Sequence, residues 1–463
     1  MAGKGLVLVV IDGLTPAMLE RAVESRRAPA LALLAERASY GRAVSTFPSL
    51  TPVCLSSIAT GSHPDVHHIP HLVWYDRGAR RFVEYGSSFA ALRTAGTRRS
   101  IIDTIFHMND RHLSADAVTV YEALEDAGFR AAAINVTCYR GRTRHRTTLP
   151  GVRRTANGPS RFFFYNLFES DETGAPLAVR HRAAGTVDGY AAAVGRWLVT
   201  RDCFDFLLYY LSDYDFASHA FGPEGAEHVL ERTDAAVAAL LDAGGGVDEF
   251  LDRYAVVVCS DHGQTAVTRA ERLEAAFADL ELARPGARSR GSVAVAASNR
   301  AGMVYRLPGC PEDVGELALR LDGRPEVDVV LYLEGDEAVA RREGEELRFA
   351  RGDGGWETSG DRAVLRYPDA LERTWAALHN PNAGDLLVSA REGVEFADLG
   401  GAHHTGGGSH GSLVPGDSIV PVLTIGVDGG SEPASITDLA PLVLEHFGVE
   451  PPGSMRRAAA MAA

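Results

Sequence analysis

A carboxylate and an imidazole lie close together in the segment SDYDFASHAFGP. Asp215 and His219 are four residues apart, so a helical turn would place both side chains on one face. Carboxylate oxygens and imidazole nitrogens are ligands that suit Zn²⁺. Asp213 is a competing carboxylate, and a helix start capped by an aspartate is the alternative interpretation. The segment alone leaves both interpretations open.

Two further acidic turns follow apolar runs. Asp261 and His262 come directly after YAVVVCS, and Asp12 comes directly after LVLVVI. At a turn from strand to loop, adjacent side chains can reach one centre, so each turn is a candidate metal or phosphate site. Taken singly, each is also a common polar turn.

The segment TFPSLTPVCLSSIATG supplies a candidate nucleophile. Thr51 precedes Pro52, and proline suits the first position of a helix, so we expect Thr51 at the helix N-cap. A hydroxyl there faces unpaired N–H groups and the positive end of the helix dipole, which would favour a phosphoryl oxygen. A bound metal would lower the pKa of this hydroxyl and make it a nucleophile. A plain threonine cap is the alternative.

The histidines are placed unevenly along the chain. His410 lies in the glycine-rich segment GGAHHTGGGSHGS, whose backbone could let the side chain approach a metal. With Thr51 and the aspartates, it completes a set of loop residues suited to two metals. Two metals about 3.5–4 Å apart clamp the attacking and leaving oxygens of a displacement at phosphorus.

Strands and helices alternate along the chain in the pattern of an α/β fold. We expect strands at 6–11, 129–136, 204–211, 254–263 and 419–426, and helices at 16–24, 29–37, 51–60 and 224–241. Apolar runs that end in polar residues, with helices between them, predict a large, mostly parallel central sheet with helices on both faces. Ligands bind outside the carboxyl ends of such strands, so one edge of the sheet could collect the candidate residues.

The pattern changes between about 280 and 395, where short strands alternate with a hairpin-like segment, REGEELRFARGDGG. We therefore predict a main catalytic α/β body of residues 1–280 and 395–463. Residues 281–394 would form a small inserted α+β cap. The length of 463 residues would otherwise suggest about three domains.

Composition limits the partners and the compartment. With 46 basic and 61 acidic residues, the net charge of −15 argues against a nucleic-acid polymer or an anionic membrane as partner. Five widely spaced cysteines without a CxxC pair indicate reduced thiols and a cytoplasmic location. The first apolar run is too short for a signal peptide, and none is long enough to span a membrane. The oligomeric state is left open.

The ordered set IDG, LTPVCLSSIATGSHP, SDYDFASHAFGP, SDHG and GSHG resembles the alkaline phosphatase superfamily. It is most similar to the nucleotide pyrophosphatase/phosphodiesterase branch. The resemblance covers roughly residues 5–265 and 395–450. It implies a metal-dependent hydrolase of phosphoric esters that acts on a small-molecule phosphoryl substrate. It also implies two divalent metal ions, with Zn²⁺ the expected identity, and a covalent phosphothreonine intermediate.

The resemblance assigns a role to each motif. Thr51 matches the nucleophile of the family. One metal would be held by four residues: Asp12, Thr51, Asp261 and His262. The other would be held by Asp215, His219 and His410, because the pattern D-x-x-x-H followed by x-x-G-P matches at Asp215 rather than at Asp213.

The substrate contacts are less defined by the sequence. Many relatives carry an asparagine downstream of the nucleophile that donates to the phosphoryl oxygen, but this chain has IPHLVWYD there. His71 is a candidate replacement, with backbone amides as the alternative. Seven arginines between 140 and 161, Arg142 and Arg144 among them, could form an arm that binds an anionic substrate. They could equally pair with the chain's own acids.

The expected function is therefore a phosphodiesterase similar to the nucleotide pyrophosphatases. Three alternatives stay open. The same site could serve a phosphonate C–P hydrolase or a phosphomonoesterase, or the chain could be a catalytically silent metal-binding homologue.

Overall fold

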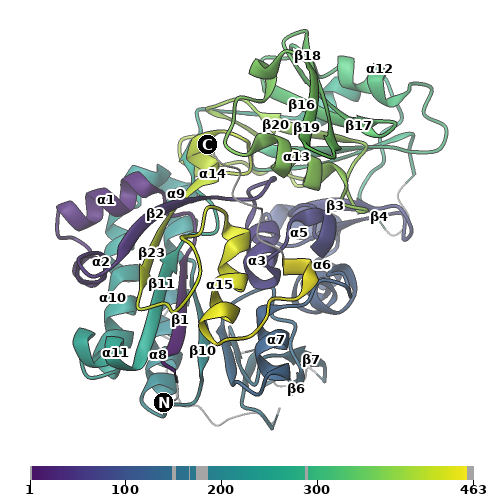
Figure 1. Cartoon of the computed structure of the whole chain (residues 1–463). Helices are drawn as coiled ribbons and strands as arrows, with labels where there is room; N and C mark the ends of the chain where they lie inside the picture. Colours follow the sequence, from purple (N-terminus) through teal and green to yellow (C-terminus); the bar gives the residue numbers. More distant parts are fainter. Residues whose placement is uncertain (1–2, 149–152, 166, 174–185, 287–289, 456–463) are drawn as a thin grey trace.

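The structure is a computed structural model that describes residues 3–148, 153–165, 167–173, 186–286 and 290–455. Short stretches of the predicted body and of the predicted cap, and part of the arginine-rich segment 140–161, therefore lie outside the described residues. An eight-stranded sheet forms the centre of the body (Figure 1). In spatial order its strands are β2 (Ser39–Val44), β23 (Ile419–Ile425), β11 (Tyr254–Cys259), β1 (Gly5–Ile11), β10 (Phe206–Leu211), β5 (Ala131–Ile134), β8 (Arg161–Phe164) and β9 (Phe168–Ser170).

The central strands of this sheet are parallel, as the sequence predicts. β1 pairs in parallel with β10 and β11, and β5 pairs in parallel with β10 and β8. β23 runs antiparallel to both of its neighbours, β11 and β2. Its chain enters from the edge where β11 ends, because the N–H of Gly263 donates to the carbonyl of Asp417 at 3.0 Å. A strand that starts at this edge must run back across the sheet.

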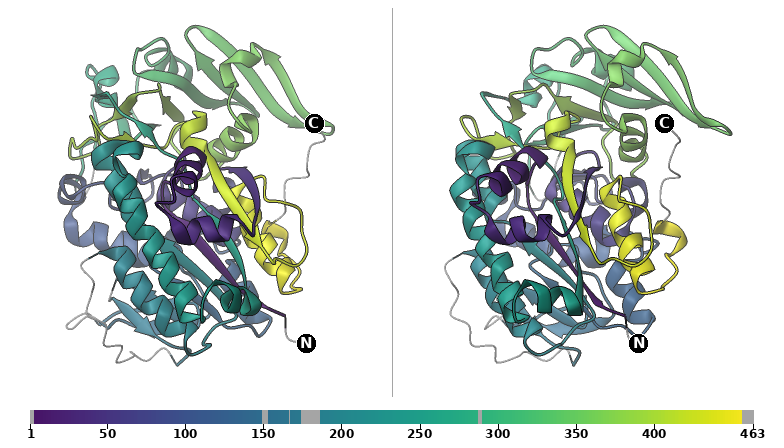
Figure 2. Two further views of the ribbon diagram at one scale, coloured as in Figure 1. Left: turned by 90° about the vertical axis from the view of Figure 1, so that its left-hand side faces the viewer. Right: turned by 60° about the vertical axis from the view of Figure 1, so that its left-hand side comes forward.

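Helices cover both faces of the sheet (Figures 1 and 2). Along β1, alternate side chains point to opposite faces, so Leu8 belongs to one core cluster and Val9 to the other. The first face carries α3 (Thr51–Thr60), α7 (Val120–Asp126) and α15 (Leu439–His446). The second carries α1 (Pro16–Glu24), α2 (Pro29–Ala35), α8 (Val187–Val199), α10 (Glu227–Ala243) and α11 (Val247–Arg253).

A second, antiparallel sheet lies above the body in Figure 1. Its seven strands are, in spatial order, β14 (Val293–Ser298), β15 (Ala301–Arg306), β20 (Leu386–Ala390), β16 (Val327–Glu334), β17 (Glu337–Arg342), β18 (Glu345–Gly352) and β19 (Gly355–Gly360). Helices α12 (Val314–Leu319) and α13 (Ala370–Leu378) accompany it. One hydrophobic cluster contains both Leu8 of the body and Tyr305 of this sheet, so the two layers share a core.

Short elements surround the edge between the two sheets. They are α4 (Pro64–His67), the hairpin β3 (Val73–Asp76) and β4 (Arg81–Glu84), α5 (Phe89–Ala95), α6 (Thr97–Ile102), a π-helix (Asp103–His112) and α9 (Asp213–Gly225). Small two-stranded pairings link β6 (Thr143–Arg146) with β7 (Thr155–Gly158), β12 (Thr265–Ala266) with β22 (Gly408–Ser409), and β13 (Arg269–Glu271) with β21 (Val394–Phe396). A short helix, α14 (Pro415–Ser418), leads into β23.

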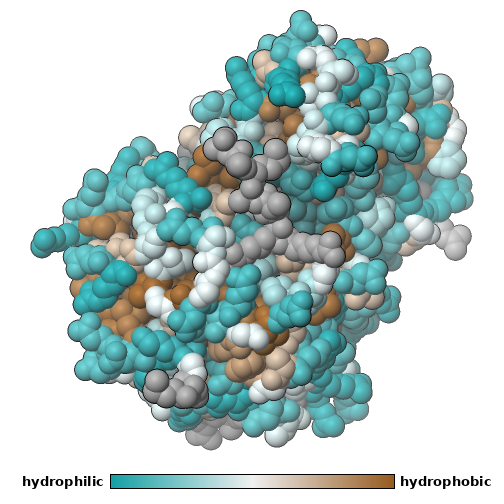
Figure 3. Space-filling view, viewed as in Figure 1, coloured by the Kyte–Doolittle hydropathy of each residue, from teal (hydrophilic) through white to brown (hydrophobic). Residues whose placement is uncertain are grey.

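The outer surface is consistent with a charged chain. The face in Figure 3 is largely hydrophilic, with hydrophobic side chains in small patches. Within the described ranges, none of the helices combines the length and the apolar character needed to cross a bilayer.

Candidate active site

The ends of the parallel strands bring four predicted residues together. Asp12 follows β1, and Asp261 and His262 follow β11. Nε2 of His262 lies 3.2 Å from Oδ1 of Asp12 and 3.5 Å from Oδ2 of Asp261. Oγ1 of Thr51 lies 3.1 Å from the same nitrogen. All but Thr51 are buried, so these residues form a compact candidate metal cluster beside one hydroxyl.

A second group adjoins the first. Nε2 of His219 lies 3.3 Å from Oδ2 of Asp215, and Nε2 of His410 lies 3.9 Å from Oδ1 of the same carboxylate. The rings of His262 and His410 stack with centroids 3.6 Å apart. The pairing of β12 with β22 produces this contact, because it places the His410 loop against the turn that carries His262. The two groups therefore form one continuous site.

Each of the three histidines is held by its Nδ1 atom. A backbone carbonyl can only accept, so each Nδ1 donates: His262 to Gly263 at 3.0 Å, His219 to Gly408 at 2.8 Å and His410 to Ser49 at 2.7 Å. Such contacts fix the ring orientation of ligating histidines. They leave all three Nε2 atoms directed at the carboxylates, in the arrangement that metal binding requires.

The electrostatics of the site favour a bound cation. Burial and then the charge of Asp215 raise the pKa of Asp12, and burial and then the charge of Asp12 raise that of Asp261. Burial opposes a charge on His262, but Asp261 and Asp12 outweigh it and raise the pKa of His262 to about 10. Oδ1 of Asp12 and Oδ2 of Asp261 accept no hydrogen bond, and their shared contact is the ring nitrogen of His262. Because two buried carboxylates that share one imidazole are poorly compensated, these oxygens fit a divalent cation.

Two side chains hold the carboxylates in place, and a glycine leaves room for one of them. The hydroxyl of Tyr210 donates to Oδ2 of Asp12, and Nε2 of Gln264 donates to Oδ1 of Asp215 at 2.7 Å. Gly13 adopts φ +71°, and a Cβ there would lie 2.8 Å from Oδ1 of Asp215. The close approach of Asp215 to the turn after β1 therefore requires glycine at position 13.

Thr51 does not occupy the N-cap of α3, so this prediction was wrong by one residue. Leu50, in an extended conformation, is the N-cap, and it makes no side-chain capping hydrogen bond. Proline is tolerated at either of the first two helical positions, which is why Pro52 does not fix the boundary. As the first helical residue, Thr51 is not used as the cap and turns its hydroxyl toward His262.

Asp213 and Asp215 have different surroundings. The carboxylate of Asp213 accepts from the N–H groups of Val187 at 3.2 Å and Asp188 at 3.1 Å, at the start of α8. Asp215 instead lies among the candidate ligands, where the charge of His219 outweighs burial and lowers its pKa. The structure thus gives Asp213 a backbone-binding role.

A cavity of about 1410 Å³ opens onto the site and contains Asp12, Thr51, Asp215, His219 and His410 in its wall. Three phenylalanines also line it, although most of their surface is exposed: Phe89 at 87%, Phe216 at 82% and Phe221 at 61%. Apolar side chains that gather beside a cavity mark a candidate binding surface. The cavity therefore combines a polar floor with an apolar rim.

The three predicted substrate contacts do not line this cavity. His71 is fully buried, and its Nδ1 accepts from the N–H of Val73 at 3.1 Å. Arg142 pairs with Glu122 at 3.0 Å and with Asp126 at 2.7 Å. Nε of Arg144 donates to Thr155 at 3.2 Å. The hairpin of β6 and β7 directs these arginines toward α7 and its own strands, which favours the alternative that they pair within the chain.

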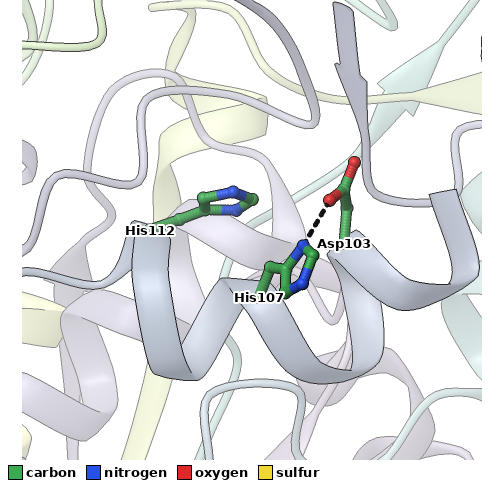
Figure 4. Close-up of side chains that lie close together, drawn as sticks. All are labelled: Asp103, His107 and His112. Carbon is green, nitrogen blue, oxygen red and sulfur yellow. Dashed lines mark hydrogen bonds and ion pairs between the residues drawn. The ribbon is translucent and has the colours of Figure 1, made fainter. Parts of the chain in front are cut away.

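A third group of potential ligands lies on the π-helix (Figure 4). With about 4.4 residues per turn, a π-helix places positions i, i+4 and i+9 on one face, here Asp103, His107 and His112. However, Arg81 donates to both carboxylate oxygens of Asp103, at 2.5 and 3.0 Å, and Nδ1 of His107 lies 2.8 Å from one of them. Because Arg81 already balances the charge of Asp103, we assign this group to the support of the π-helix.

Sequence reasoning missed three residues of the site: Tyr210, Gln264 and Asn299. Tyr210 lies in an apolar strand, where its hydroxyl needs a partner, and Gln264 directly follows the SDHG turn. These two could have been noticed. Asn299 comes from the second sheet, and its amide lies 3.2 Å from Nε2 of His410. Nothing in the local sequence indicates this contact.

The mostly parallel sheet with helices on both faces is the alkaline phosphatase-like fold that the sequence predicts. The chain matches the family described as type I phosphodiesterase/nucleotide pyrophosphatase over residues 6–413, and it belongs to this family. Its members hydrolyse phosphoester bonds. A search of curated protein sequences gives no match.

Solved structures with a similar fold come from two kinds of enzyme. Phosphonoacetate hydrolase from Sinorhizobium meliloti 1021, in complex with phosphonoformate, has a TM-score of 0.61 and 19% identity. Murine ectonucleotide pyrophosphatase/phosphodiesterase 5 has a TM-score of 0.62 and 13% identity. Each alignment covers 97% of this chain and 96% of the other. An inactive variant of the murine protein, in complex with AMP, gives a TM-score of 0.61 at 13% identity.

Proposed function

We propose that the protein is a two-metal phosphodiesterase in which Thr51 attacks phosphorus. The observation that carries this proposal is the position of the Thr51 hydroxyl, 3.1 Å from Nε2 of His262 and exposed to the cavity. It stands beside two sets of buried carboxylates and histidines. Asp12, Asp261 and His262 would hold one ion together with Thr51, and Asp215, His219 and His410 would hold the other.

Two divalent ions, with Zn²⁺ the expected identity, would lower the pKa of the attacking hydroxyl and stabilise the negative charge on the leaving oxygen. The residues of the chain perform the rest. Oγ1 of Thr51 gives up its proton to water and forms a bond to phosphorus as the P–O bond to one ester group breaks, and the released alkoxide takes a proton from water. A water oxygen then bonds to phosphorus as the P–Oγ1 bond breaks, which releases the phosphomonoester, and Oγ1 takes back a proton to restore the hydroxyl of Thr51.

The cavity supports a substrate with a bulky ester group. Its volume of about 1410 Å³ greatly exceeds the space that a phosphoryl group needs, and its apolar rim could cover one ester substituent. Among the described residues that line it, Arg232 is the only arginine or lysine. A diester with one large apolar group would fit this lining better than a small substrate with a second anionic group.

The same nucleophile could serve a phosphomonoester or a phosphonate, and a silent homologue is the remaining alternative. The candidate ligand set is complete, which argues against a silent protein. The cytoplasmic location, which the free cysteines support, is also part of the proposal.

A substrate panel tests the proposed function. Purified protein loaded with Zn²⁺ is assayed with bis(p-nitrophenyl) phosphate, p-nitrophenyl phosphate and phosphonoacetate. We expect the diester to have the highest kcat/KM, with activity lost to a chelator and restored by Zn²⁺. A higher kcat/KM for the monoester or the phosphonate would contradict the diester preference. Bound metal without turnover of any of the three would contradict catalysis itself.

A further inference from the structure

Asn299 is a residue of the second sheet that reaches the active-site cavity. It follows β14 at the turn into β15, and it lines the same cavity as Thr51. Its backbone has φ +57°, a region that asparagine enters more readily than most residues. Unusual backbone conformations that persist in a buried place often mark a functional group.

The orientation of the Asn299 amide is determined from both ends. Oγ of Ser298 donates to Oδ1 of Asn299 at 2.9 Å, because the amide oxygen can only accept. At the other end, Nδ2 lies 3.2 Å from Nε2 of His410. Nδ1 of His410 donates its proton to the carbonyl of Ser49, so Nε2 is the acceptor nitrogen of the neutral ring. Asn299 therefore presents an N–H donor to the site.

The main chain around Asn299 is fixed as well. Its carbonyl accepts from the N–H of Phe396 at 2.7 Å, and the N–H of Arg300 donates to the carbonyl of His410 at 2.9 Å. The buried guanidinium of Arg300 pairs with Asp417 at 2.9 Å. The donor is thus held in a defined place relative to the His410 loop.

We propose that Asn299 is a substrate-binding residue that donates a hydrogen bond to a non-bridging oxygen of the phosphoryl group. This proposal rests on the proposed function. If Nε2 of His410 is a metal ligand, its lone pair no longer accepts from Asn299, and the N–H donor becomes available to an anionic oxygen in the cavity. A neutral amide provides this contact without another charge beside the carboxylates. The second sheet thereby contributes directly to substrate binding.

The competing explanation is that Asn299 only positions His410. The two roles differ in what they change. A residue that positions His410 affects metal content, whereas a donor to the phosphoryl group affects the affinity for an anion at unchanged metal content.

The experiment compares Asn299→Asp and Asn299→Gly, two replacements that tolerate a positive φ. Each is combined with Thr51→Val, loaded with Zn²⁺ and titrated calorimetrically with inorganic phosphate, and its metal content is measured by mass spectrometry. The reference is the Thr51→Val protein. Ser298→Ala, which removes only the orienting hydroxyl, serves as the matched variant.

We expect both Asn299 variants to bind phosphate about tenfold to a hundredfold more weakly, as for a lost hydrogen bond to a charged group. Ser298→Ala should show a smaller loss, and all proteins should retain the same metal content. Unchanged phosphate affinity, or a fall in metal content that accounts for the loss, would overturn the proposal. The proposed function is tested separately: if it fails, the wild-type protein does not hydrolyse the diester. In that case the phosphate affinities still decide the role of Asn299.

Discussion

Oγ1 of Thr51 lies 3.1 Å from Nε2 of His262, although 211 residues separate them in the sequence. The start of α3 carries the hydroxyl, and the end of β11 carries the imidazole. Both lie at the edge where the parallel strands of the body terminate. The Thr51 hydroxyl does not cap the helix, and this contact places it next to the buried carboxylates. The proposed reaction depends on that position.

Gly13→Ala should disrupt the site without unfolding the body. The new Cβ would lie 2.8 Å from Oδ1 of Asp215, so that carboxylate must move away from its histidines. We expect diester hydrolysis to fall by at least about tenfold, together with the metal content. The control is Gly128→Ala, which shares a positive φ (+90°) but has nothing within 4 Å of its Cβ. Equal losses in the two variants would mean that backbone strain, not the contact with Asp215, is responsible.

Phe216→Ala and Phe221→Ala should weaken substrate binding more than they slow the chemical step. Their side chains line the cavity but are largely exposed, so stability should change by less than about 0.5 kcal/mol. We expect KM for bis(p-nitrophenyl) phosphate to rise several-fold, because an aryl group loses apolar contact, while the affinity for inorganic phosphate stays the same. Leu319→Ala, at an exposed position of α12, is the control. Steady-state kinetics with KM unchanged in both phenylalanine variants would refute a role for the rim.

Glu84 should make stability depend on pH. It is buried, and burial raises its pKa to about 7 despite hydrogen bonds from Ser87 and Gly86. Between pH of about 4.5 and 7 the folded protein keeps this proton while the unfolded chain loses it, so the free energy of unfolding falls as pH rises through this window.

Glu84→Gln removes this titration. Relative to wild type, the variant should gain up to about 3 kcal/mol between pH 5 and pH 8, from 1.36 kcal/mol per pKa unit. Urea denaturation at both pH values measures the difference. Parallel stability curves for the two proteins would show that Glu84 ionises normally in the fold.

Arg142→Ala and Arg144→Ala should leave catalysis intact. Both side chains face acids or hydroxyls of their own surroundings, and exposed ion pairs contribute only about 0–1 kcal/mol. We expect KM for an anionic diester within twofold of wild type. A marked rise in KM in either variant would restore the arginine-rich segment as a substrate arm.

Much of the fold follows from the spacing of apolar residues and from the residues that mark the ends of helices and strands. The helices expected at 16–24 and 51–60 match α1 and α3, which begin beside prolines and have clear ends. The parallel centre of the sheet follows from apolar runs that end in polar residues. The direction of β23 does not follow from the sequence, because an apolar run gives no sign of its direction in the sheet. The direction is set by the edge of the sheet at which the chain enters the strand.

The site shows a similar division. Asp12, Asp261 and His262 could be predicted together because the ends of parallel strands share one edge. His71 and Arg142 could not be excluded, since their residue types suit phosphate but the direction of a side chain depends on tertiary packing. Asn299 could not be predicted at all, because its contact with His410 exists only when the second sheet is docked on the body.

The central claim is that Thr51 is the nucleophile, and one comparison tests it most directly. Thr51→Val and Thr46→Val each remove a hydroxyl while keeping the shape of the side chain. Thr46 is a matched control because its hydroxyl is buried and has no hydrogen-bond partner. With metal content measured in both, we predict that Thr51→Val lowers kcat for bis(p-nitrophenyl) phosphate by at least about a thousandfold. Thr46→Val should remain near the wild-type rate. A Thr51→Val protein with full metal content and near wild-type turnover would contradict the account.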